Sequence, residues 1–170
     1  MRAPRVVRDA LPMMLATRLA LVFALTLAPP TQASELGKRA GWEVMESPKP
    51  YDLLLRDLLA AVKSEGLIVV TQAGPTKAAA ARGITIPGNR VVGVFNNDYA
   101  VRILALSTAA MIEAPIRFYV TEDARGGSHL SYKRPSHVFA PYFGEGGSLL
   151  LKISKDLDQR FAAITAAALR

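Results

Sequence analysis

The sequence predicts an α+β fold, a two-layer sandwich in which about five mainly antiparallel strands form a sheet with helices packed on one face. Two observations lead to this prediction. Segments with the alternation or β-branched composition of strands are interspersed with segments whose apolar residues recur every three or four positions. The last two strand-like segments are separated by a short loop with adjacent glycines, which is typical of an antiparallel hairpin. One sheet covered by helices would bury the apolar sides of both kinds of element.

The first part of the domain is predicted to contain a strand, a helix and a second strand. Trp42–Ser47 alternates apolar and polar residues, as half-buried strands do, and Ser47 is a candidate helix cap. From Tyr51 onward, leucines at three- and four-residue spacings predict an amphipathic helix that Gly66 closes. Leu67–Thr71 is a run of apolar and β-branched residues, which predicts a buried strand.

The middle of the chain is predicted to continue with a short helix, a strand and a further helix. Thr76–Arg82 has helical composition, and Arg90–Phe95 is strand-like. Within that strand, Gly93 marks either a bulge or a place where another backbone comes close. Asparagines and an aspartate then offer caps for a helix from about Tyr99 to Ser107.

The last part is predicted to be a hairpin followed by a long helix. Ile116–Thr121 and Ser128–Arg134 form the hairpin, and apolar spacing from Leu150 to Ala168 predicts the helix. Between them lie three aromatic residues, for which core or interface packing and ligand stacking are both open: Phe139, Tyr142 and Phe143. The glycines at 144–147 indicate a turn.

The first 33 residues have the organisation of a secretory signal. Four arginines precede the apolar stretch Leu19–Ala28, and Pro29 and Pro30 separate it from small residues ending at Ala33. We expect cleavage between Ala33 and Ser34, and a periplasmic or secreted protein that meets the membrane only transiently. The alternative is a retained anchor, but a span of about 20 apolar residues would have to bury Arg18.

This interpretation sets the domain organisation and the charge of the processed chain. Residues 1–33 are the signal, 34–47 a leader and first strand, and 48–170 a single α+β domain. Without the signal, 17 basic and 13 acidic residues remain, so the net charge falls from +7 to +4. Basic residues do not alternate with aromatic ones in a run, so we expect no nucleic-acid partner. Cysteine is absent, which excludes disulfides, thiol nucleophiles and Cys-ligated zinc.

Several segments together resemble a known family. They are Lys63–Gly66 with the strand that follows, Val92–Asn97 with Ala100 behind it, Ala114–Val120, and Tyr132–Pro135. Over roughly Tyr51–Pro135 the chain is similar to the bacterial and archaeal family called domain of unknown function 302. Asn97 stands where that family usually has proline, a change that a helix start tolerates. The resemblance implies a compact α+β fold and homodimers, and it supplies no catalytic residue.

Alternation in the hairpin predicts a polar face of the sheet. If Ile116, Phe118 and Val120 point to the core, the residues between them point to the opposite face. This interpretation makes four residues candidates for binding a small anionic ligand: Arg117, Tyr119, Ser131 and Lys133. Arginine offers a planar fork of donors that suits carboxylates. A solvated face or a dimer contact remains the alternative.

Glu113 and His129 are candidates for acid–base catalysis. Glu113 precedes the Ala114–Pro115 entry to a core strand, where partial burial would raise the pKa of its carboxyl. His129 would lie on the polar face, and the alternative for both is an ordinary surface charge. His129 and His137 are eight residues apart without a metal-binding motif, so no metal or other cofactor is predicted.

The sequence therefore favours an exported, homodimeric and non-catalytic domain that binds a small ligand or a partner. The alternative is a small periplasmic hydrolase or isomerase that uses Glu113 or His129 as its acid–base group.

Overall fold

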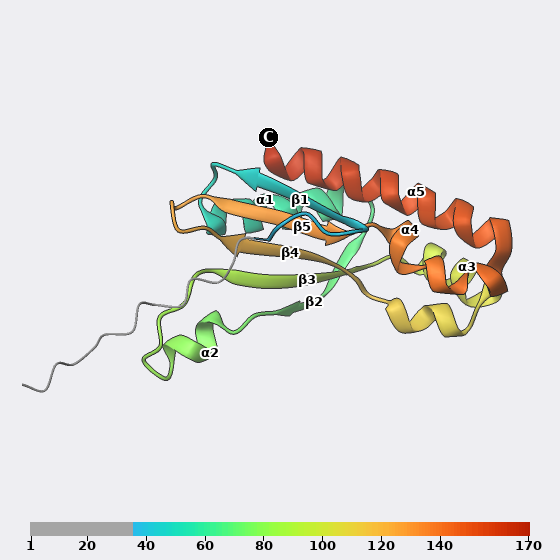
Figure 1. Cartoon of the computed structure of the whole chain (residues 1–170), viewed down its shortest axis with the longest axis horizontal. Coiled ribbons are helices and arrows are strands. Elements are labelled where there is room, and N and C mark those ends of the chain that lie inside the picture. The colour runs from blue at the N-terminus through green and yellow to red at the C-terminus, as the bar shows by residue number, and fades with distance from the viewer. Residues whose placement is uncertain (1–35) are drawn as a thin grey trace, which may run out of the picture. The chain divides into compact units, whose positions relative to one another are not determined.

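One five-stranded antiparallel sheet forms a layer of the fold, and helices cover one of its faces (Figure 1). The computed structural model describes residues 36–170, so the predicted signal and its cleavage site lie outside the described residues. The strand order is β1-β5-β4-β3-β2, and every neighbouring pair is antiparallel. The strands are β1 Trp42–Ser47, β2 Ile68–Ala73, β3 Asn89–Phe95, β4 Ile116–Glu122 and β5 Ser128–Lys133.

Along the described residues, three helices lie between consecutive strands and two follow the last strand. They are α1 Tyr51–Ser64, α2 Thr76–Ala80, α3 Asn97–Leu106, α4 Pro135–Val138 and α5 Phe143–Leu169, with 3-10 turns η1 Ala109–Glu113 and η2 Ala140–Tyr142. The long helices α1 and α5 pack against each other on the covered face, and α3 packs against α5 near one end of the sheet (Figure 1). The predicted two-layer α+β fold with five antiparallel strands is confirmed.

Most predicted element boundaries agree with the structure, with differences at two helices. Pro50 stands at the N-cap of α1, while the hydroxyl of Ser47 accepts a hydrogen bond from the Lys49 amide instead. Gly66 follows the C-cap of α1 with a positive φ of 75°, as predicted. Helix α5 begins at Phe143 rather than Leu150, but Gly147 has non-helical backbone angles and kinks it. The predicted turn in this glycine-rich stretch is therefore a kink within a longer helix.

Strand β2 is an edge strand, so the prediction of a buried strand at Leu67–Thr71 is wrong. It pairs with β3 alone, and Ile68 and Val70 are 59% and 46% exposed. Leu67, which precedes the strand, is buried. A β-branched run fits a pleated sheet at its edge as well as at its centre, so composition did not separate the two cases.

The core consists of two clusters along α5. The larger lies between the sheet and helices α1 and α5, where the rings of Phe118 and Phe161 stack with centroids 4.4 Å apart. The smaller joins α3, α5 and the segment before α5, and it includes Tyr99, Phe139 and Leu150. Phe139 is 2% exposed and belongs to this second cluster, so for this aromatic residue the core-packing alternative is confirmed.

Candidate functional site

Side chains on the uncovered face of the sheet are arranged in rows across the strands. The register pairs Trp42 of β1 with Lys133 of β5, and Arg117 of β4 with Gly93 of β3. Because Phe118 pairs with Tyr132, continuing that register by one residue places Arg117 opposite Lys133. Partners in an antiparallel ladder project to the same face. Trp42, Lys133 and Arg117 therefore form one row, which we call the cationic row.

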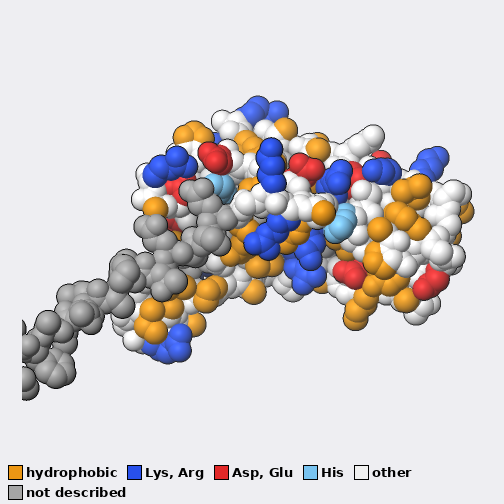
Figure 2. Space-filling view, in the orientation of Figure 1, with side chains coloured by type: hydrophobic (Ala, Val, Ile, Leu, Met, Phe, Trp, Pro, Cys, Tyr) orange, Lys and Arg blue, Asp and Glu red, His pale blue; other side chains and the backbone are white. Residues whose placement is uncertain are grey.

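A hollow of about 620 Å³ lies over this row. Its polar lining includes Asn89, Glu113, Arg117, Tyr119, Tyr132, Lys133 and His137. Its apolar lining includes Trp42, Val91, Ile116 and Val138. Figure 2 shows Lys and Arg side chains gathered over the strands near the middle of the view, with a histidine beside them. A hollow of several hundred Å³ is of the size that holds small organic ligands.

Close packing of Gly41 against α4 places Trp42 and His137 at one end of the hollow. A Cβ on Gly41 would lie 2.1 Å from Cγ of His137, so a larger residue would displace the imidazole. The Arg134 amide also donates to the Gly41 carbonyl at 2.8 Å, which ties the start of β1 to the end of β5. The Trp42 ring has two cations over it, with Lys133 Nζ at 5.6 Å and Arg39 Cζ at 5.7 Å from its centroid.

The charges in the hollow do not neutralise one another directly. Among residues 36–170, the ion pairs within 4.0 Å include neither Arg117, Lys133 nor Glu113. The Glu113 carboxylate instead accepts a hydrogen bond from the Tyr142 hydroxyl at 2.9 Å. This carboxylate beside the phenol raises the pKa of Tyr142. Two cations and one carboxylate thus line the same space, and each keeps capacity for a further partner.

Tyr119 adds a neutral hydrogen-bond donor to the hollow. Its hydroxyl oxygen accepts from Asn89 Nδ2 at 2.5 Å. The asparagine therefore occupies an acceptor position of the phenol and leaves the phenolic proton available for another acceptor. Asn89 comes from β3 and Tyr119 from β4, so the position of this donor depends on the pairing of the two central strands.

Because Gly93 has no Cβ, the side chains of Thr71 and Pro115 can lie close to it, beside the cationic row. A Cβ there would lie 2.2 Å from Thr71 Oγ1 and 2.9 Å from Cγ of Pro115. The register of β2 shifts between Val69 and Thr71, directly opposite this glycine. The prediction for Gly93 was a bulge or a close approach of another backbone, whereas the atoms nearest to it belong to side chains and the register shift lies in the neighbouring strand β2.

The structure brings some of the predicted site residues together and separates others. Arg117, Tyr119, Lys133 and Glu113 all line the hollow. Ser131 shares their face but is fully buried, and its hydroxyl donates to the Tyr119 carbonyl at 3.4 Å.

His129 lies outside the lining of the hollow. It pairs with Thr121 on β4, four residues beyond Arg117, which is about 13 Å along a strand. It is also 7% exposed, although it was predicted to share an open polar face. Glu113 and His129 therefore do not belong to one site.

The lining residues that the sequence did not indicate as site residues include Trp42, Asn89 and His137. Trp42 and Asn89 join it through pairing with distant strands, and His137 through the packing of α4 beside Gly41. The alternation of β1 assigns Trp42 to one face, but without the register of β1 and β5 it does not say which residues lie beside it.

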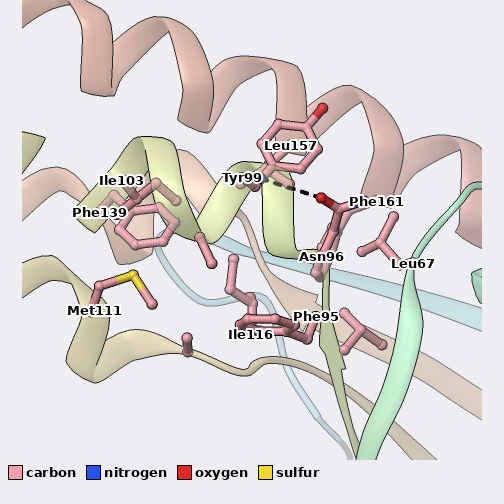
Figure 3. Close-up of a pocket in the computed structure, with 13 residues that line it drawn as sticks. Leu67, Phe95, Asn96, Tyr99, Ile103, Met111, Ile116, Phe139, Leu157 and Phe161 are labelled. Atoms are coloured by element: carbon pink, nitrogen blue, oxygen red, sulfur yellow. Dashed lines mark hydrogen bonds between the residues drawn. The ribbon is translucent and has the colours of Figure 1, made fainter. Parts of the chain in front are cut away.

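A second, much smaller cavity of about 40 Å³ lies within the fold and is bordered mainly by apolar side chains (Figure 3). It is bordered by α3, α5 and the strands, with Ile103, Met111 and Phe139 among its lining. Asn96 caps α3 at its edge, where its Oδ1 accepts from the amides of Asp98 at 2.9 Å and Tyr99 at 3.2 Å. Its volume of about 40 Å³ is only slightly above the roughly 30 Å³ that one water molecule occupies in the liquid, so it is too small for an organic ligand. Ile116 borders both this cavity and the large hollow.

A polar network beside the small cavity holds the helices together. The Tyr99 hydroxyl donates to Asp156, and Arg160 donates to the same hydroxyl at 2.6 Å and to the Glu65 carbonyl at 3.0 Å. Burial, together with the Asp156 carboxylate, raises the pKa of Tyr99. These contacts join α1, α3 and α5, so we assign the network a structural role.

Metal-binding clusters and membrane-spanning helices are both absent from residues 36–170. Within residues 36–170, no cluster of three or more His, Asp or Glu side chains is placed to share a metal ion. No helix in the same range has both the length and the apolar character that crossing a membrane requires.

Comparison with known proteins finds a family and a fold. Residues 43–168 match the family model described as domain of unknown function DUF302. The chain is also similar to a crystal structure of an uncharacterized conserved protein DUF302 from Bacillus stearothermophilus. The two share 18% identity with a TM-score of 0.67, over 78% of this chain and 100% of the other. No curated protein matches the chain.

Proposed function

The chain belongs to the family described as domain of unknown function DUF302, and that description assigns no activity. From the hollow, we propose that it is an exported protein that binds a small organic anion. The anion would occupy the hollow over the uncovered sheet face. Arg117 and Lys133 would hold its charged group, while Tyr119 would donate a further hydrogen bond.

The observation that carries this proposal is the pair of adjacent cations without a carboxylate partner. Both side chains are exposed, and among residues 36–170 neither makes an ion pair. Adjacent like charges repel, and a bound anion relieves that repulsion. A hydrogen bond to a charged group contributes about 1.5–3 kcal/mol, so two or three of them can support measurable affinity.

Calorimetric titration with 3-phenylpropanoate tests the proposal, because this probe has one carboxylate and an apolar body. We expect the full chain to bind it, and Arg117→Gln and Lys133→Gln each to weaken binding about tenfold. Lys152→Gln is the matched control, since it removes an equal charge from an exposed position on α5. Equal weakening by all three substitutions would point to general electrostatics, and no binding by the unsubstituted chain would refute the proposal.

We propose export and homodimerisation as the setting of this function. The signal-like first 33 residues support export, and a mature protein that begins at Ser34 in the envelope or medium fraction would establish it. Exposed Ile68 and Val70 on the edge strand β2 support self-association, since unpaired edges readily pair with another chain. Light scattering should give twice the chain mass, and Val70→Lys should lower it.

A second candidate function is acid–base catalysis on the bound anion by Glu113. It is favoured by the position of this carboxylate inside the hollow, held by Tyr142. His129 has less support in this role because its side chain does not line the hollow. A substrate screen followed by Glu113→Gln tests the candidate, since a hydrolase or isomerase of this kind would lose turnover while ligand binding persisted.

A further inference from the structure

We propose that the ligand of the hollow is an amino acid or a similar aminocarboxylate, with an apolar side chain. This inference rests on the proposed anion-binding function and deepens it. It assigns Glu113 to the recognition of a positively charged group on the ligand.

The charges of the hollow are arranged as two poles. Arg117 and Lys133 form the positive pole, and Glu113 forms the negative one. Within residues 36–170 the carboxylate lies more than 4.0 Å from the nitrogens of both cations, although it lines the same hollow. A ligand with a carboxylate and an ammonium group satisfies both poles at once. A simple carboxylate satisfies one pole and is repelled by the other.

Glu113 is held in position while it keeps capacity to bind. The Tyr142 hydroxyl donates to Oε1 at 2.9 Å, and this contact joins the end of η1 to η2. An ionised carboxylate accepts several hydrogen bonds, so Oε2 and part of Oε1 remain for a ligand. A residue fixed by such a contact loses less conformational freedom on binding, which favours a defined ligand orientation.

The remaining lining suits an apolar side chain. Val91, Ile116 and Val138 provide aliphatic surface, and Trp42 provides an aromatic ring at the end where Lys133 lies. Burial of apolar area contributes about 25 cal/mol per Å², so this wall favours amino acids with large apolar side chains over small or polar ones. Phenylalanine is a suitable probe, since it has both charged groups and an aromatic body.

Three probes separate the contributions of the two charged groups at pH 7. Phenylalanine has both groups, 3-phenylpropanoate lacks the ammonium, and phenethylamine lacks the carboxylate. By calorimetry on the full chain, we expect phenylalanine to bind about tenfold more tightly than 3-phenylpropanoate. Phenethylamine should bind most weakly, because it meets two cations and one carboxylate.

Glu113→Gln tests the assignment of the negative pole. It keeps the shape of the side chain and an acceptor for Tyr142, and we expect it to abolish the tenfold preference for phenylalanine while 3-phenylpropanoate binds at least as well as before. Glu46→Gln is the control, because it removes an exposed carboxylate at the far end of the uncovered face. That variant should keep the preference.

The outcomes distinguish this inference from the proposed function on which it rests. Equal affinity for phenylalanine and 3-phenylpropanoate in the unsubstituted protein would overturn the aminocarboxylate assignment and leave anion binding intact. A preference that survives Glu113→Gln would also overturn it. Binding of neither carboxylate would refute both proposals together.

Discussion

Two glycines determine how closely neighbouring segments approach the hollow. Gly93 accommodates Thr71 and Pro115 beside the cationic row, and Gly41 accommodates His137 beside Trp42. In both places the space that a Cβ would need is already occupied. The positions of Arg117 and Trp42 therefore depend on the absence of a Cβ at the neighbouring Gly93 and Gly41.

Gly93→Ala should destabilise the protein by about 1–3 kcal/mol, because its Cβ would overlap Thr71 Oγ1. Urea unfolding measures the change. Thr71→Ala removes the conflicting hydroxyl, so the cost of Gly93→Ala should be smaller in that background by about 0.5 kcal/mol or more. Identical costs in both backgrounds would contradict steric conflict at this contact.

Tyr132 makes stability fall at high pH. Burial, with Glu43 and Asp158 nearby, raises its pKa from 10.0 to about 12. The unfolded chain therefore loses this proton at lower pH than the native protein does. The resulting stabilisation is complete below pH 10 and is lost as the pH rises to about 12.

Urea unfolding at a series of pH values from about 9 to about 12, the range in which a phenol titrates, measures this loss of stability. In Tyr132→Phe the decline should be shallower, and one late-titrating phenol should disappear from the tyrosinate absorbance. An unchanged slope in this variant would show that other groups cause the decline.

Individual elements form for local reasons, but their environments depend on the rest of the fold. Strand β2 has strand composition and is a strand, yet its place at the sheet edge follows from pairing with β3 alone. Helix α3 begins where Asn96 caps it, as the asparagines of this segment predict. Capping is a contact between residues close in sequence, whereas burial requires knowledge of distant partners.

The cap of α3 can be tested with two neighbouring asparagines. Asn96 accepts hydrogen bonds from two backbone amides, while Asn97 is exposed in the first turn. Asn96→Ala should cost about 1 kcal/mol of stability, and Asn97→Ala should cost much less. Chemical denaturation measures both, and equal costs would contradict a specific capping role.

The part of the candidate site that the sequence predicts is the part set by the alternation of side chains along each hairpin strand. Alternation assigned Arg117, Tyr119, Ser131 and Lys133 to one face, and the register agrees. It did not reveal that small Ser131 is buried between larger neighbours. Trp42, Asn89 and His137 join through contacts between segments far apart in sequence, which a single sequence without alignment does not specify.

On the scale of the whole molecule, α5 connects the two core clusters. Phe161 packs with Phe118 in the larger cluster, and Leu150 packs with Phe139 in the smaller one. Although Gly147 kinks the helix, the buried α5 residues of both clusters all follow the kink. One continuous helix thus contributes to both clusters, which favours cooperative unfolding.

We therefore expect one unfolding transition for residues 36–170. Phe118→Ala and Phe139→Ala lie in different clusters, and each should lower the stability of the same transition by about 3–5 kcal/mol. Circular dichroism and Trp42 fluorescence should report coincident midpoints in both variants. Separate midpoints would mean that the smaller cluster unfolds independently.

The position of Ile116 limits how the ligand specificity of the hollow can change by substitution. Its side chain forms part of the wall between the surface hollow and the small cavity beneath α3. A larger residue there would crowd one side or the other, and a smaller one would join two spaces of very different polarity. A substitution at Ile116 therefore changes both the shape of the hollow and the packing of the interior. Val91 and Val138 border the hollow but not the small cavity. Substitutions at these two positions can therefore change the shape of the hollow without disturbing the small cavity.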